Sequence, residues 1–224
     1  DGIYTQITQE NLPLIRGLSS SYGLAFTPGP FVESIQIIKG TGSVINGFES
    51  FSGQINIEYF KPDCDESLYY NLYGSLEGKI ENNLRLVKKN GKWKSNLFAH
   101  FSLHEKEIDN NDDGFLDMPH ITNFNFLNRW KYENEKIGLQ FYVRGFIEER
   151  IGGTIDNNSN PYLVEINNKL IELSSKTGFR IPSKTGKSIG LQTSFRVHDF
   201  DAAFGANKYS CLLYTSPSPR DPKI

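Results

Sequence analysis

Residues 109–117 carry oxygen-bearing side chains at the spacing of a calcium loop. They read Asp-Asn-Asn-Asp-Asp-Gly-Phe-Leu-Asp: oxygen donors fall on alternate positions, and the glycine permits a sharp turn between them. The ligands predicted by this pattern are Asp109, Asn111, Asp113, the backbone carbonyl of Phe115, and Asp117. His120 stands at the twelfth position, where strong sites have a bidentate Glu. Sensor-type affinity is therefore not expected, and a solvated acidic loop is the alternative interpretation.

Other chemistry-bearing residues form no motif. The four histidines are scattered and are interpreted as polar strand or loop residues: His100, His104, His120 and His198. Two cysteines are too few for a disulfide framework or a cysteine-based zinc site. No nucleophile with a positioned base, paired catalytic carboxylates or cofactor fingerprint is visible, so we predict that the protein is not an enzyme. It should require no cofactor, Ca²⁺ being the one candidate ion.

Alternating apolar and polar residues indicate β-strands from residue 67 to residue 209. In residues 137–148 one side carries Ile, Leu, Phe and Val, whereas the other carries Gln140, Tyr142, Arg144 and Glu148, as period two requires. The same pattern recurs in residues 93–104 and 189–198. Further candidate strands are residues 68–77, 80–88, 123–132 and 202–209, which gives about seven antiparallel strands in up-and-down order.

The connections between these strands differ in length. Tight turns are predicted at residues 78–79, 89–91, 133–135 and 199–201, and long polar loops at residues 105–122 and 150–186. Short turns on one rim and long loops on the other are typical of outer-membrane barrels. A soluble β-sandwich is the alternative. There is no apolar run long enough for a membrane helix, but a tilted membrane strand needs only about 9–11 residues.

A glycine-containing motif near the N-terminus is more specific. Residues 37–42 read Ile-Ile-Lys-Gly-Thr-Gly, and residues 53–57 read Gly-Gln-Ile-Asn-Ile. This region resembles the end of the plug domain of TonB-dependent receptors, in the version found in Bacteroidota, with Thr41, Asn46, Ser52 and Gln54 as departures. The motif positions are Lys39, Gly40, Gly42, Gly47, Gly53 and Asn56. The glycines are interpreted as structural, since no Gly-Lys-Ser/Thr of a phosphate loop follows.

The resemblance implies a mainly all-β fold: a partial transmembrane β-barrel of antiparallel up-and-down strands, preceded by the C-terminal part of an α+β plug domain. Residues 1–60 would be plug, and residues 61–210 the first seven or so strands of a barrel of about 22 strands. Residues 211–221 match the in-frame translation of a sequencing adapter, so residues 211–224 are interpreted as an artefactual tail; a disordered Pro/Ser tail is the alternative. We expect an export signal, a coupling box and the rest of the plug upstream.

The resemblance also implies a function. The expected activity is TonB-dependent uptake of a nutrient complex across the outer membrane of a Gram-negative bacterium. A ferric siderophore or another metal chelate is the first candidate, and a vitamin or oligosaccharide the second. The expected partners are the TonB complex, a small ligand and the lipid bilayer. Nucleic acid is not expected, because the net charge is -2 and the pI is about 6.1. A secreted calcium-binding β-domain in adhesion is the alternative function.

Two groups of residues are candidates for contact with the substrate. Residues 16–24 resemble an apical plug loop, in which Arg16, Ser19, Ser20 and Tyr22 would touch the ligand; ordinary turn chemistry is the alternative. Arg144 and Arg196 would face the barrel lumen, where they either hydrogen-bond to the plug or contact the substrate. Trp93, Trp130 and Tyr132 are candidates for the aromatic girdles at the membrane surface.

Overall fold

The computed structural model describes residues 5–14, 23–24, 26–42, 50–155, 161–181 and 187–215. The chain divides into two compact units, Asp1–Cys64 and Asp65–Ile224, and each contains its own β-sheet. The described residues include no helix with the length and apolar character that a membrane span requires. The prediction of a mainly all-β fold is confirmed.

The first unit contains a four-stranded sheet in the order β2-β1-β4-β3. Its elements are β1 (Thr5–Gln9), β2 (Leu12–Pro13), the 3-10 helix η3 (Gly29–Phe31), β3 (Val32–Lys39) and β4 (Gly53–Tyr59). β1 runs parallel to β4, and the other pairs are antiparallel. Ile55 on β4 pairs with Ile7 on one side and Ile37 on the other. Side chains alternate between the faces of a sheet, so these isoleucines form an apolar face.

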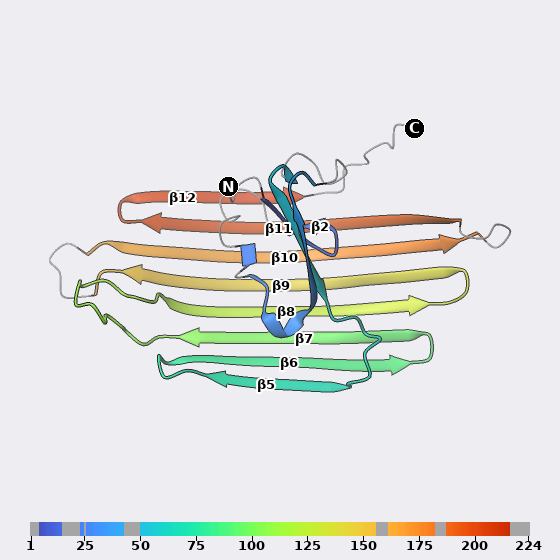
Figure 1. Ribbon diagram of the computed structural model, residues 1–224, viewed down its shortest axis with the longest axis horizontal. Helices are drawn as coiled ribbons and strands as arrows, with labels where there is room; N and C mark the ends of the chain where they lie inside the picture. The colour runs from blue at the N-terminus through green and yellow to red at the C-terminus, as the bar shows by residue number, and fades with distance from the viewer. Residues whose placement is uncertain are drawn as a thin grey trace. The chain divides into compact units, whose positions relative to one another are not determined.

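The second unit is an eight-stranded antiparallel sheet whose strands follow chain order (Figure 1). The strands are β5 (Leu68–Gly74), β6 (Lys79–Asn90), β7 (Trp93–His104), β8 (His120–Glu133), β9 (Ile137–Gly153), β10 (Leu163–Arg180), β11 (Ser188–Phe204) and β12 (Asn207–Thr215). Every strand pairs with its neighbours in sequence. The up-and-down order predicted from alternation is therefore present.

The two faces of this sheet differ in polarity. Val143, Leu173 and Phe195 pair in one row, whereas the adjacent residues Arg144, Glu172 and Arg196 pair in the next row. Adjacent residues point to opposite faces, which defines an apolar face and a polar face. On β9 the apolar face runs from Leu139 to Ile147, about 27 Å along the strand. Residues 171–179 of β10 pair with residues 137–145 of β9 and with residues 189–197 of β11. Segments 139–147, 171–179 and 189–197, which overlap across the three strands, are termed the apolar band.

The strand ends define two rims. The ends of β6, β8 and β10 form the short-turn rim, with connections 91–92 and 134–136. The ends of β5, β7, β9 and β11 form the long-loop rim, with connections 75–78, 105–119 and 205–206. The predicted separation is therefore incomplete, because the short connections 75–78 and 205–206 share a rim with the long loop 105–119. Trp93 and Tyr132 pair beside the short-turn rim, with ring centroids 5.0 Å apart. Trp130 stacks on Phe141 at 4.7 Å. All four aromatic rings lie on the apolar face, as expected of an aromatic girdle.

Two strand predictions were wrong. β10 lies inside the predicted loop 150–186, so the sheet has eight strands rather than seven. Residues 199–201 are not a turn: β11 continues through them, and the chain reverses at Gly205, which has a φ of 57°. Asp199 and Asp201 instead extend β11 beyond the apolar band, on the face that is apolar within the band.

The end of β12 includes residues that the sequence analysis interprets as a tail. Cys211 to Thr215 pair with β11, from Phe200 to Arg196. Strand pairing does not bear on the origin of these residues, and the artefactual tail stays a prediction. Residues 216–224 lie outside the described residues.

Candidate ligand-contacting face

The motif residues of the first unit surround the turn between β3 and β4. Lys39 ends β3, and Gly40 follows with a φ of 88°, a conformation that favours glycine. The amide of Gly42 donates to the carbonyl of Ser50 at 2.7 Å. A Cβ at Gly42 would lie 2.7 Å from Ser50 Cβ, and one at Gly53 would lie 3.0 Å from a backbone oxygen. The backbone conformation at Gly40 and the close contacts at Gly42 and Gly53 therefore explain why glycine occupies these positions. Gly47 lies outside the described residues.

Asn56 joins the strands of the first unit through its side chain. Its Oδ1 accepts hydrogen bonds from Thr8 Oγ1 at 2.9 Å and from the Asn11 amide at 2.9 Å. Its Nδ2 donates to Glu58 Oε1 at 3.2 Å and to Gln36 Oε1 at 3.4 Å. The side chain is 3% exposed, so these bonds replace water and fix β1 and β3 against β4.

A charged cluster occupies the middle of the polar face of the second unit. Glu172 Oε1 accepts from Arg196 Nη2 at 2.8 Å and from the Tyr142 hydroxyl at 3.0 Å. Arg144 pairs with Glu172 across β9 and β10. Arg129 Cζ lies 5.8 Å from the centroid of the Tyr142 ring. Arg129, Arg144 and Arg196 therefore share this part of the polar face with Glu172, and guanidinium groups are the side chains best suited to carboxylates and other planar anions.

A second polar network lies toward the long-loop rim. Arg150 binds Glu148 through two hydrogen bonds of 2.8 and 2.9 Å. Glu148 also accepts from Asn123 Nδ2 at 2.8 Å, and Asn123 Oδ1 accepts from Asn125 Nδ2 at 2.8 Å. Such fork-shaped arginine–carboxylate contacts fix the orientation of both side chains. The network therefore presents rigid amide groups on this part of the face.

Three of the four histidines make hydrogen bonds to nearby residues, and within the described residues they form no metal-binding cluster. His100 Nδ1 lies 2.6 Å from Asn83 Oδ1, and His198 Nε2 lies 2.6 Å from Asn168 Oδ1. His104 lies 3.0 Å from the carbonyl oxygens of both Pro119 and Glu77, so it joins two connections of the long-loop rim.

The predicted calcium loop folds around its own backbone amides. Asp109 accepts from the amides of Asp113 at 3.2 Å and Gly114 at 2.9 Å, and Asp113 accepts from the Phe115 amide at 2.8 Å. Asp117 accepts from the amide and side chain of Asn110 at 3.0 and 2.8 Å. Within the part of the chain that the structure describes, no three acidic, histidine or cysteine side chains converge as metal ligands. Calcium binding stays a prediction.

The predicted substrate residues fall into two sets. Arg16, Ser19, Ser20 and Tyr22 lie outside the described residues. Arg144 and Arg196 share the polar face, two strands apart, with Glu172 between them. Sequence reasoning missed Glu172 because it assigned this segment to a loop. The signal that could have found it is the alternation of Ile171 and Leu173 with polar neighbours.

Comparison with solved structures identifies the fold. No family model and no curated protein matches the chain. The copper transporter OprC superposes with a TM-score of 0.72 at 12% identity, covering 90% of this chain and 30% of that one. The ferric enterobactin receptor PfeA, in complex with BCV-L6, gives 0.54 at 11% identity, covering 89% and 42%. The chain thus spans less than half of either protein. At the level of fold, the resemblance to TonB-dependent outer-membrane receptors is confirmed.

Proposed function

We propose that this chain is part of a receptor that imports a nutrient complex across the outer membrane of a Gram-negative bacterium, with energy supplied through TonB. The observation that carries the proposal is the pairing of two features in one chain. The four-stranded sheet holds the Lys39 to Asn56 motif, and the eight-stranded meander separates an apolar from a polar face. The superposition on OprC at a TM-score of 0.72 supports the same assignment.

A membrane location accounts for the apolar face. The apolar band has the height of about 25 Å that barrels present to lipid, and exposed residues such as Ile171, Ile189 and Leu191 lie on it. Charged residues Glu149, Asp199 and Asp201 follow on the same face toward the long-loop rim. This distribution would be unfavourable in water, because a large contiguous apolar surface would remain exposed.

We propose a ferric siderophore or another metal chelate as the substrate, with a vitamin or oligosaccharide as the second candidate. The guanidinium groups of Arg129, Arg144 and Arg196 favour an anionic ligand. Arg144 and Arg196 are the proposed contacts, whereas their hydrogen bonding to Glu172 and to a plug is the alternative role. The structural neighbours carry the names of a copper transporter and a ferric enterobactin receptor. A transport role needs no enzymatic centre.

Uptake by intact cells tests the proposal. The complete gene would be expressed in a strain that lacks its own ferric-chelate receptors, and cell-associated ⁵⁵Fe would be measured with a panel of chelates. We expect accumulation with at least one chelate, and its loss when tonB is deleted. A chelate that binds at the surface but accumulates equally without TonB would contradict energy-coupled import.

The adhesion alternative makes a different prediction. A calcium-dependent adhesive domain should bind its target only with Ca²⁺, and Asp109→Asn should abolish that binding. The transport proposal expects ⁵⁵Fe uptake to be unchanged by chelation of external Ca²⁺. The two functions therefore differ in their dependence on external Ca²⁺, which can be tested on the same cells.

A further inference from the structure

One histidine of the long-loop rim lies between two backbone carbonyl groups. His104 ends β7 and is fully buried. Its Nδ1 lies 3.0 Å from the carbonyl oxygen of Pro119, and its Nε2 lies 3.0 Å from that of Glu77. Pro119 immediately precedes β8, and Glu77 belongs to the connection between β5 and β6. A single ring therefore joins the connections on both sides of its own strand.

Both partners of this ring can only accept hydrogen bonds. A neutral imidazole carries one N–H donor and one acceptor nitrogen, whereas the imidazolium form carries two donors. In the neutral form, one ring nitrogen would direct its lone pair at a carbonyl oxygen without forming a hydrogen bond. Because the ring is buried, such an unmade bond is costly. Only the imidazolium form of His104 satisfies both carbonyl groups.

Two other buried histidines differ from His104 in this respect. His100 Nδ1 lies 2.6 Å from Asn83 Oδ1, and His198 Nε2 lies 2.6 Å from Asn168 Oδ1. A side-chain amide can present either its oxygen or its NH₂ group, so a neutral ring can be satisfied at both positions. A backbone carbonyl offers no such choice. Of these three rings, the one at position 104 is therefore the one that needs two protons.

The connections that His104 joins are tied together by a second cation. Lys106 Nζ donates to the carbonyl of Leu76 at 3.2 Å, so two adjacent carbonyl groups of connection 75–78 accept from side chains at the end of β7 or just beyond it. On its other side, the 105–119 connection is bound to the end of β9, where the Leu116 amide donates to the Gly153 carbonyl at 2.8 Å. A change at His104 therefore acts on a group of connections that are joined to one another.

Charged and titratable side chains from each neighbouring element lie around His104. They are Lys79 and Glu81 of β6, Glu77 of the β5–β6 connection, Glu105 and Lys106 of the β7–β8 connection, His120 of β8, and Glu148 and Arg150 of β9. Lys79 binds Glu81, and Arg150 binds Glu148. His120 lies on the opposite face of the sheet, because its neighbour Ile121 is the residue that pairs with His104. Histidine is the side chain whose charge ordinarily changes between about pH 5 and 8.

We propose that His104 is a pH-dependent clamp of the long-loop rim. As an imidazolium it donates to Glu77 and Pro119 and holds connections 75–78 and 105–119 together. When the ring releases a proton to water as the pH rises, one of the two carbonyl groups loses its donor and the connections separate more often. In the proposed receptor the long loops face the exterior, so the clamp responds to the pH outside the cell. That consequence rests on the proposed function, whereas the clamp itself is tested without it.

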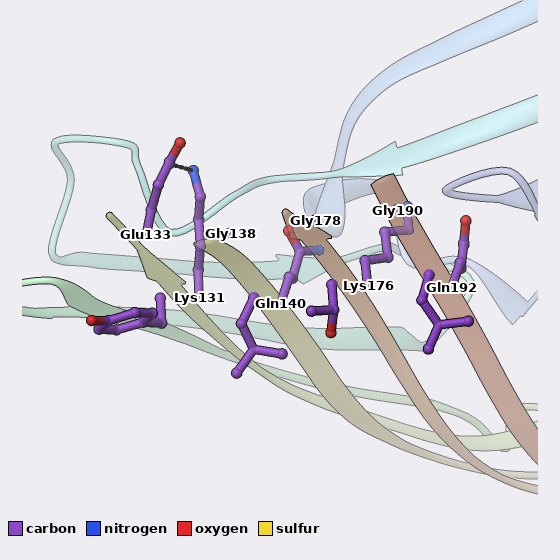
Figure 2. Close-up of a pocket in the computed structure, with 12 residues that line it drawn as sticks. Lys131, Glu133, Gly138, Gln140, Lys176, Gly178, Gly190 and Gln192 are labelled. Carbon is purple, nitrogen blue, oxygen red and sulfur yellow. Dashed lines mark ion pairs between the residues drawn. The ribbon is translucent and has the colours of Figure 1, made fainter. Parts of the chain in front are cut away.

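The short-turn rim provides an internal control. There Glu133 accepts from Arg180 Nη2 at 2.8 Å and contacts Lys131 Nζ at 3.2 Å (Figure 2). The hydrogen bond and charge of Lys131, followed by the hydrogen bond from Arg180, hold the pKa of Glu133 below its usual value. None of the chain's four histidines, all of which the structure describes, lies at this rim. Its contacts should therefore stay constant where those of His104 change.

The test follows hydrogen exchange of backbone amides in the complete protein in lipid nanodiscs, at about pH 5.5 and about pH 8. Protection factors correct for the intrinsic effect of pH on exchange. The Gly78 amide donates to Ser75, and the Asp117 amide to Ile108. Protection of these two amides should fall about tenfold at the higher pH. Protection of the Asn134 amide, in the short-turn rim, should change less than about twofold.

His104→Gln should lower the protection at the lower pH to the level of the unaltered protein at the higher pH, and it should abolish the pH dependence. Two matched controls should retain that dependence: His100→Gln, on the same face of β7, and His120→Gln, on the opposite face of β8. Lys106→Met should lower protection at both pH values and leave its pH dependence intact. A pH dependence that survives in His104→Gln, or that disappears in either control, would overturn the proposal.

The unaltered protein supplies a second, independent measurement. With ¹⁵N-labelled histidine, magic-angle-spinning NMR distinguishes a ring nitrogen that carries a proton from one that does not. Both nitrogens of His104 should carry protons at about pH 5.5, and one should have lost its proton at about pH 8. A bare nitrogen at the lower pH, or two protons at the higher pH, would also overturn the proposal. This result decides the matter even if His104→Gln does not fold.

Discussion

A charge placed in the centre of the apolar band should destabilise the protein in a lipid bilayer. Leu173 lies near the middle of the band, between Val143 and Phe195, and is 46% exposed. Arg at the midplane of a barrel costs about 2–4 kcal/mol. With a denaturation slope of about 2 kcal/mol per M, the urea midpoint of Leu173→Arg should fall by about 1–2 M.

The matched control is Asn167→Arg, on the same face of β10 and about 20 Å farther along the strand. Asn167 pairs with Glu149 and Asp201, outside the apolar band, and a charge near the interface costs only about 0–1 kcal/mol. Reversible unfolding in lipid vesicles, followed by tryptophan fluorescence, gives both values. Equal and small effects of the two substitutions would refute the lipid-facing assignment, since an exposed Leu in water can be replaced by Arg at little cost.

Three further predictions concern single side chains. Glu172→Gln should destabilise the sheet by about 3 kcal/mol in urea unfolding, because it removes the buried charge that binds Arg196; a loss no larger than that of the exposed control Glu165→Gln would contradict this. Asn56→Ala should cost the first unit about 1–3 kcal/mol, measured as faster limited proteolysis between residues 5 and 60, and unchanged cleavage would show that the four hydrogen bonds add little. Glu133 forms ion pairs with Lys131 and Arg180. These pairs should contribute to the free energy of unfolding above pH 4.5, and the contribution should be lost as the pH falls through the lowered pKa of Glu133. In Lys131→Gln the NMR pKa of this carboxyl should rise toward 4.5, and no rise would exclude Lys131 as the main cause.

Alternation in the sequence predicted the strands in which apolar residues recur regularly on one face. β9 shows this best, because its apolar face carries Leu, Phe, Val and Ile with only Gly145 between them. β10 was missed because Leu170 and Ile171 are adjacent apolar residues on opposite faces, and because Glu165, Asn167 and Lys169 occupy its outer face before the band begins. Period two weakens where polar residues occupy the face that is apolar elsewhere in the strand.

The sequence predicted which residues lie on the polar face, but not which side chains they contact there. Arg144 and Arg196 were expected on it from their place in the alternation. Their common carboxylate, Glu172, comes from a strand between them, and its position depends on the register of β10 with both neighbours. Register depends on turn positions, and the sequence placed one of these turns wrongly, at residues 199–201.

The two sheets differ in how far along the chain their partners lie, and this difference has a consequence for the order of assembly. Each strand of the larger sheet forms backbone hydrogen bonds with the strand that precedes it in the chain, so this sheet can form one hairpin at a time during chain synthesis or insertion. β1 can pair with β4 only after the intervening residues have been added, because Thr5 pairs with Gly53 and Gln9 with Ile57. Contacts that close long loops form more slowly. The smaller sheet should therefore be the slower of the two to acquire its final hydrogen bonds, even though most of it leaves the ribosome first.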